Sequence, residues 1–136
     1  MNDTIVAIAT PPGQGAIGIV RLSGPASRDI ALALFHSSRP RFGGLKPYHL
    51  HHGRILGQGG RFVDEVLLAW MPGPRSFTGE DVAELHCHGG GTVLREVVEE
   101  CLARGARLAG PGEFSKRAFL NGRVDLTQAE AIMELV

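Results

Sequence analysis

The sequence predicts a domain of the α/β class, in the broad sense that includes α+β folds, with a mixed, largely antiparallel sheet and packed helices. Short runs rich in Ile, Val, Leu and Ala recur between turns rich in Gly and Pro, which is typical of strands. Longer segments carry apolar residues at helical spacing. With 136 residues, the chain is long enough to bury a sizeable core.

Two strands and a helix are predicted in the first part of the chain. An apolar run over residues 4–9 ends at a Thr-Pro-Pro-Gly turn, and a second strand follows over residues 16–22. A helix with an apolar stripe is expected over residues 26–35. Arg21 is a charged residue in an otherwise apolar strand, so it forms either a surface or structural ion pair or a contact to a ligand.

The middle of the chain is predicted to form a loop followed by a hairpin. Residues 36–47 are polar, broken by proline and rich in glycine, and they expose Arg39, Arg41 and Lys46. This basic loop is either simply solvated or a contact to RNA phosphate. Strands over residues 49–56 and 62–71 are joined by a glycine-rich connection. The histidines of the first strand are expected to be exposed or hydrogen-bonded rather than metal ligands.

Acids, imidazoles and glycines converge only in residues 76–91. The alternation of residues 82–88 predicts a strand with Glu84, His86 and His88 on one face. Three glycines then open an amphipathic helix whose first N–H groups could approach a ligand.

The last part of the chain is predicted to contain a short strand over residues 106–109 and a helix over residues 113–121, with Phe114, Ala118 and Phe119 directed inward. Asp125 and Gln128 form a variant of the capping box at the start of a further helix. We expect residues 1–122 to form one domain and residues 123–136 to begin a helical domain of a longer protein.

Composition excludes several classes of protein. Fourteen Lys and Arg balance fourteen Asp and Glu, so net charge alone does not indicate a nucleic-acid binder. Cys87 and Cys101 are too few for a disulfide framework and are expected as buried thiols in a reducing cytosol. The sequence contains neither a signal peptide nor a membrane span, so a cytoplasmic location is expected.

The residues around Glu84 leave three chemical interpretations open. Glu84, His86 and His88 on one strand face could hold zinc or non-haem iron in a metal-dependent enzyme. Glu84 alone could accept two adjacent N–H groups of a pterin or guanine. The third interpretation is a polar edge that meets water and backbone. The sequence has no GxSxG motif and no GxxxxGK[ST] phosphate loop, so this chain cannot hydrolyse GTP by itself.

Three long blocks of the chain closely resemble the N-terminal part of the MnmE/TrmE family of tRNA-modification GTPases. They are DTIVAIATPPGQGAIGIVRLSGP, PGPRSFTGEDVAELHCHGG and GPGEFSKRAFLNGRVDLTQAEAI, in the same order as in the family. The resemblance implies a domain similar to the folate-binding part of the glycine-cleavage T-protein. It also implies a homodimer that binds 5-formyltetrahydrofolate or methylene-tetrahydrofolate. GTP, magnesium and potassium would belong to a GTP-binding domain outside this chain.

The resemblance further implies partners and site residues. With the flavin-dependent protein MnmG, also called GidA, the family modifies C5 of the tRNA wobble uridine. Its folate contacts fall on Arg21, Glu84 and Arg123 of this sequence, and His88 is a candidate wall of the pocket. By this hypothesis Glu84 pairs with the pterin N–H groups, and the two arginines meet carbonyl or carboxylate oxygens. A metal-dependent enzyme and a purely structural dimerisation domain are the alternatives.

Overall fold

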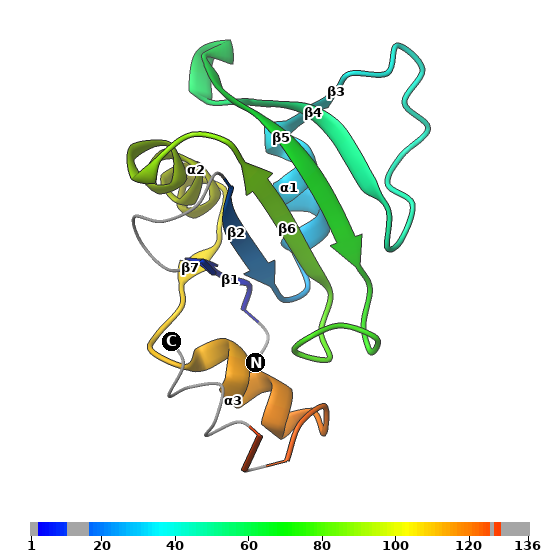
Figure 1. Cartoon of the computed structure of the whole chain (residues 1–136), viewed down its shortest axis with the longest axis vertical. Coiled ribbons are helices and arrows are strands. Elements are labelled where there is room, and N and C mark those ends of the chain that lie inside the picture. The colour runs from blue at the N-terminus through cyan, green and yellow to red at the C-terminus, as the bar shows by residue number, and fades with distance from the viewer. Residues whose placement is uncertain (1–2, 11–16, 126, 129–136) are drawn as a thin grey trace.

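The structure is a computed structural model that describes residues 3–10, 17–125 and 127–128. Its centre is a seven-stranded sheet in the order β3-β4-β5-β6-β2-β1-β7 (Figure 1). The strands are β1 Ile5–Ile8, β2 Gly18–Ser23, β3 Phe35–Ser37, β4 Leu50–Leu56, β5 Phe62–Met71, β6 Val82–Cys87 and β7 Arg107–Leu108. The helices are α1 Ser27–Leu34, α2 Gly91–Ala103 and α3 Glu113–Leu120, with a 3-10 turn at Gln58–Gly60.

Strand pairing confirms the predicted fold class. β1 and β7 run parallel, and the other neighbouring strands run antiparallel. β2 is inserted between β1 and β6, although β6 lies far from it in sequence. Because of this insertion, Arg21 of β2 lies directly opposite Glu84 of β6.

Helices α1 and α2 pack on one face of the sheet. Alternate residues of the central strands, such as Val20, Leu22 and Leu85, form the core with apolar residues of these helices. Cys87 and Cys101 lie in this core as free, fully buried thiols, and burial raises the pKa of each to about 12. The prediction of buried thiols is therefore confirmed.

Two local predictions are wrong. Residues 35–37 form the short edge strand β3, because they pair with β4, whereas the sequence predicted a loop from residue 36. Phe119, predicted to face inward, is 41% exposed, because the buried face of α3 consists of Ser115, Arg117 and Ala118. The remaining predicted strands and helices agree with the structure to within a few residues where it describes them.

The predicted capping pair at the end of the described chain is confirmed. The Asp125 N–H donates to Gln128 Oε1 at 2.9 Å, and the Gln128 N–H donates to Asp125 Oδ1 at 2.7 Å. The further helix expected beyond residue 128, and most of the turn predicted at residues 10–13, lie outside the described residues. Among the helices that the structure describes, none combines the length and apolarity needed to cross a membrane.

Candidate ligand-binding site

The centre of the candidate site is an ion pair between neighbouring strands. Arg21 on β2 lies opposite Glu84 on β6, so both side chains leave the same face of the sheet. Arg21 Nε–H donates a hydrogen bond of 2.8 Å to Glu84 Oε2, and 23% and 16% of the two side chains are exposed. Of the two interpretations of Arg21, the structure shows the ion pair and leaves the contact to a ligand open.

His86 joins this group on the same face of β6. Its Nε2 lies 3.1 Å from Glu84 Oε1. The hydrogen bond from His86, followed by that from Arg21, holds the pKa of Glu84 below its ordinary value, although burial acts in the opposite direction. Glu84 is therefore ionised at neutral pH. Because a carboxylate offers about four lone-pair sites, Glu84 can accept further hydrogen bonds from a ligand.

Two aromatic rings flank the Arg21 guanidinium. Its Cζ lies 5.0 Å from the ring centroid of Phe77, in the loop between β5 and β6, and 5.7 Å from that of Phe114, in the first turn of α3. Both contacts are in the range of cation–π attraction. Within the described part of the chain, the Arg21 side chain donates hydrogen bonds through Nε alone. The two Nη groups therefore remain available to a ligand.

A pocket of about 510 Å³ opens beside Arg21. Its walls are Ala7 and Ile8 of β1, Arg21, Phe77 and residues 109–115. Small-molecule sites commonly have such a volume and such mainly apolar walls. Glu84 is not among these wall residues; it lies beside Arg21 on the same face of the sheet, one strand further from β1.

Arg123 contacts the same loop that carries Phe77. Its Nε–H donates to the Ser76 carbonyl oxygen at 2.9 Å, and the residue as a whole is exposed. The structure therefore brings Arg123 to the rim of the site through the loop, without a direct contact to Arg21 or Glu84.

His88 lies beyond the end of β6 and away from Glu84. Its backbone N–H donates to Asp64 Oδ2 at 2.7 Å, and its Nδ1 lies 2.9 Å from the Glu65 carbonyl oxygen. The same Asp64 oxygen accepts the Gly89 N–H at 3.0 Å, so an acidic side chain binds the backbone just before α2. Within residues 3–10, 17–125 and 127–128, no three His, Cys, Asp or Glu side chains are placed to hold a metal ion. Glu84, His86 and His88 therefore do not form such a group in this structure.

Comparison with known proteins places these residues in a family. The chain matches a family model described as GTP-binding protein TrmE N-terminus over residues 4–123, a range that contains Arg21, Glu84 and Arg123. The chain belongs to the TrmE N-terminal family.

Full-length relatives carry the name tRNA modification GTPase MnmE. The chain is 61% identical to the protein of Nitratidesulfovibrio vulgaris over 99% of its length. It is 56% identical to that of Lawsonia intracellularis and 54% identical to that of Chloroflexus aurantiacus, in both cases over 100% of its length. It covers only 29% to 30% of these relatives, so less than a third of their length is represented here.

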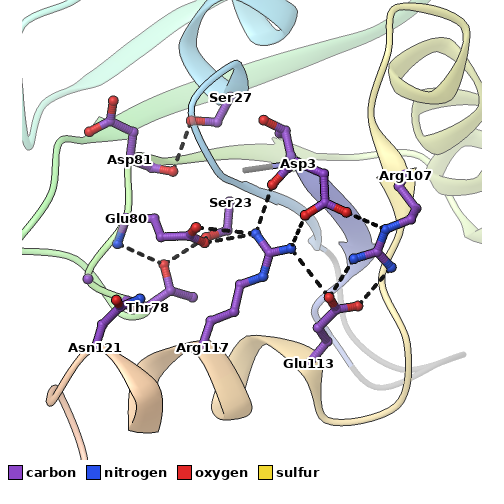
Figure 2. Close-up of polar contacts among 12 residues, drawn as sticks. Asp3, Ser23, Ser27, Thr78, Glu80, Asp81, Arg107, Glu113, Arg117 and Asn121 are labelled. Carbon is purple, nitrogen blue, oxygen red and sulfur yellow. Dashed lines mark hydrogen bonds and ion pairs between the residues drawn. The ribbon is translucent and has the colours of Figure 1, made fainter. Parts of the chain in front are cut away.

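In this TrmE N-terminal domain, a buried arginine anchors the loop that carries Phe77. Arg117 of α3 is only 2% exposed. Its Nη1–H donates to Glu80 Oε1 at 3.0 Å and its Nη2–H to Asp3 Oδ1 at 2.6 Å (Figure 2). Nη2 also donates to Glu113 Oε2 at 3.3 Å. The β5–β6 loop, the N-terminal segment and α3 are therefore joined through one guanidinium.

The loop is also bonded to β2 and to the end of α3. Ser23 Oγ donates to Glu80 Oε1 at 2.8 Å and lies 2.7 Å from Thr78 Oγ1. Asn121 Nδ2 donates to the Thr78 carbonyl oxygen at 2.8 Å. These contacts fix the backbone on both sides of Phe77 and Gly79.

Sequence analysis did not single out Phe77, Glu80, Phe114 or Arg117 as site residues. One signal was present in the family block at residues 110–132: Arg117 lies three positions after Phe114 and next to Ala118, on the inward face of the helix. An arginine on an inward face needs an acidic partner, and Glu80 provides it.

Proposed function

We propose that this chain is the folate-binding and dimerising domain of a tRNA-modification GTPase. Its ligand is 5-formyltetrahydrofolate or methylene-tetrahydrofolate. The observation that carries the proposal is the Arg21–Glu84 pair beside a mainly apolar pocket of about 510 Å³, with Phe77 and Phe114 next to the guanidinium. Folates combine a flat heterocycle with N–H donors and carbonyl and carboxylate oxygens, and the site offers a complement to each.

The side chains suit this ligand in distinct ways. The ionised Glu84 accepts the amino and ring N–H groups of the pterin, and the free Nη groups of Arg21 donate to its oxygens. The pterin edge then lies over β2 and β6, and the rest of the molecule extends into the pocket between Phe77 and Phe114. Arg123, exposed at the rim, meets a carboxylate of the tail. His88 has no part in this arrangement because its ring is bonded at the opposite end of β6.

The wider process follows from the names of the relatives. They are tRNA modification GTPases, which supports a role for this domain in tRNA modification. We assign that role to C5 of the wobble uridine, in cooperation with the flavin-dependent partner MnmG, with the bound folate as source of a one-carbon unit. GTP hydrolysis belongs to the larger part of the relatives that this chain does not cover.

Homodimerisation is part of the same proposal. Large apolar side chains lie at the surface, and Leu50, Phe62 and Leu108 are 58%, 56% and 57% exposed. Leu50 and Phe62 lie at opposite ends of the β4–β5 hairpin and Leu108 lies on β7 at the other edge of the sheet, so these three form no single patch, and the proposed dimer rests on the resemblance to the MnmE/TrmE family. Light scattering at several protein concentrations distinguishes a dimer from a monomer.

Calorimetric titration of 5-formyltetrahydrofolate into wild type and Glu84→Gln tests the binding site. Removing the charged acceptor should weaken binding by about 2 kcal/mol, roughly thirtyfold, with the fold intact by circular dichroism. Glu99→Gln is the matched control, because it removes an exposed carboxylate on α2 and should leave the affinity unchanged. Equal affinities of wild type and Glu84→Gln would contradict the pterin assignment, and a dimer that binds no folate would support the structural alternative.

A further inference from the structure

The positive charge of this neutral chain is concentrated at one edge of the sheet. Between Asp29 and Asp64 the sequence contains no acidic residue, yet it contains five of the fourteen Lys and Arg and four of the six His. All of these basic residues except Arg61, which directly precedes β5, lie in β3, β4 or the loop between them. In Figure 1 this loop, drawn in cyan, projects at the opposite end of the sheet from α3.

Three basic residues of the β3–β4 loop have no acidic partner in the described part of the chain. Arg39, Arg41 and Lys46 are exposed, and no ion pair is formed by any of them there. Arg61 differs, because it lies 3.1 Å from Glu96 and is neutralised locally. Three cations without counter-charges produce a positive potential that an anionic partner can use.

The loop that carries these cations is anchored to the fold. Leu45 is buried, and the Phe42 ring packs edge-on against Phe35 and His51, with centroid distances of 6.0 and 5.7 Å. The Lys46 N–H donates to His51 Nε2 at 3.0 Å. The basic side chains therefore extend from a defined backbone rather than from a solvated tail.

The same loop encloses a hollow of about 350 Å³. Arg39, Arg41, Lys46 and His49 line it, together with the backbone of Gly43 and Gly44. Tyr48, 54% exposed, does not line this hollow, because its hydroxyl donates hydrogen bonds to the Pro72 and Arg75 carbonyl oxygens at 3.2 and 2.9 Å, so the ring extends towards the β5–β6 loop. Exposed cations around a hollow are typical of surfaces that bind nucleic-acid phosphates.

We propose that the β3–β4 edge, defined by Arg39, Arg41 and Lys46, is an RNA-binding surface that contacts the phosphate backbone. The proposal rests on the proposed role in tRNA modification and adds a contact surface separate from the folate site. β4 is three inter-strand spacings from β2, about 14 Å, and none of Arg39, Arg41 and Lys46 lines the Arg21 pocket.

The test is a fluorescence-anisotropy titration of labelled, unfractionated tRNA against the chain at several salt concentrations, without folate. We expect Arg39→Gln/Arg41→Gln to weaken binding roughly tenfold near 0.1 M salt and to reduce the slope of log K against log salt by about 1.5, since each phosphate contact contributes about 0.7 to 0.9. Arg95→Gln/Lys116→Gln removes the same charge from exposed positions on α2 and α3 and should change the affinity less than about twofold.

The outcomes separate this proposal from the folate assignment. Unchanged tRNA affinity in Arg39→Gln/Arg41→Gln, an equal loss in the control pair, or no tRNA binding by wild type would overturn it. Loss of tRNA binding in Arg39→Gln/Arg41→Gln with folate affinity preserved would support it. Glu84→Gln should bind tRNA like wild type, so a failed folate titration does not affect this result.

Discussion

Arg21 is held in position before any ligand arrives. Its Nε is bonded to Glu84, and the Phe77 and Phe114 rings lie within 5.0 and 5.7 Å of its Cζ. A guanidinium fixed in this way loses little conformational entropy when it binds an oxygen ligand, because the side chain is already ordered. The aromatic contacts also explain why an arginine suits this position better than a lysine.

Arg117 makes the most costly polar contacts to lose. Replacing a buried partner of an ion pair leaves carboxylates uncompensated, and for Arg117→Met we expect a loss of about 3 kcal/mol or more in the free energy of unfolding. Lys116→Met, at the exposed neighbouring position, should change it by less than about 0.5 kcal/mol. Urea denaturation measures both. Arg117→Lys keeps the charge, so its loss of unfolding free energy should lie between those of Arg117→Met and Lys116→Met. A loss under about 1 kcal/mol for Arg117→Met would show that the ion-pair network of Arg117 does not stabilise the fold.

Acid should weaken the fold through Asp3 and Glu113. Hydrogen bonds from Arg107 lower the pKa of Asp3 from 3.8 to about 2 and that of Glu113 from 4.5 to about 2. Because these values are depressed in the folded state, their stabilisation is present above the unfolded values and is lost as pH falls towards 2.

Urea denaturation at pH 7 and pH 2.5 tests this acid dependence. Glu113→Gln should be less stable than wild type at pH 7 and should lose less stability than wild type between the two pH values. Glu99→Gln, which removes an exposed carboxylate of α2, should retain the pH dependence of wild type. Parallel pH profiles for Glu113→Gln and wild type would contradict the assignment.

At the scale of elements, the β5–β6 loop connects the site to the rest of the fold. Ser76 and Glu80 hold its two sides, since Arg123 donates to the Ser76 carbonyl oxygen and Arg117 to the Glu80 carboxylate. Phe77 lies between these two anchors. The position of the Phe77 wall of the pocket therefore depends on Arg117 of α3 and on Arg123, which follows that helix.

The close approach of β3 to β4 depends on Gly53. A Cβ at this position would meet the Phe35 ring at 2.5 Å and also the His36 carbonyl oxygen. Gly53→Ala should therefore cost about 1–3 kcal/mol of unfolding free energy. Gly43→Ala is the control, because nothing lies within 4 Å of its added Cβ. Equal stabilities of the two variants in urea denaturation would rule out close packing at Gly53.

Local patterns in the sequence predicted the elements better than their contacts. Alternation identified the strand that carries Glu84, and helical spacing identified α2. By contrast, β3 exists only because β4 offers a partner, and that pairing is not visible in residues 35–37. The Arg117–Glu80 pair likewise joins a helix and a loop 37 positions apart in sequence.

At the scale of the whole molecule, the sheet has two regions rich in basic residues, which differ in whether these residues are paired with acids. Near β1, β2 and α3, arginines are paired with acids around an apolar pocket. At the β3–β4 edge, Arg39, Arg41 and Lys46 form no ion pair with an acidic residue that the structure describes. Single residues such as Arg21 and Glu84 were conspicuous in the sequence, but their contact required the register of β2 against β6. The pocket could not be predicted, because four separate segments form it.

The most direct test of the central claim is an experimental structure of the chain with 5-formyltetrahydrofolate. We predict that the pterin N–H groups lie within about 2.7–3.1 Å of the Glu84 carboxylate, that Arg21 Nη donates to a ligand oxygen, and that the ligand fills the pocket beside Phe77 and Phe114. A folate bound elsewhere, with the Arg21–Glu84 pair untouched, would contradict the account.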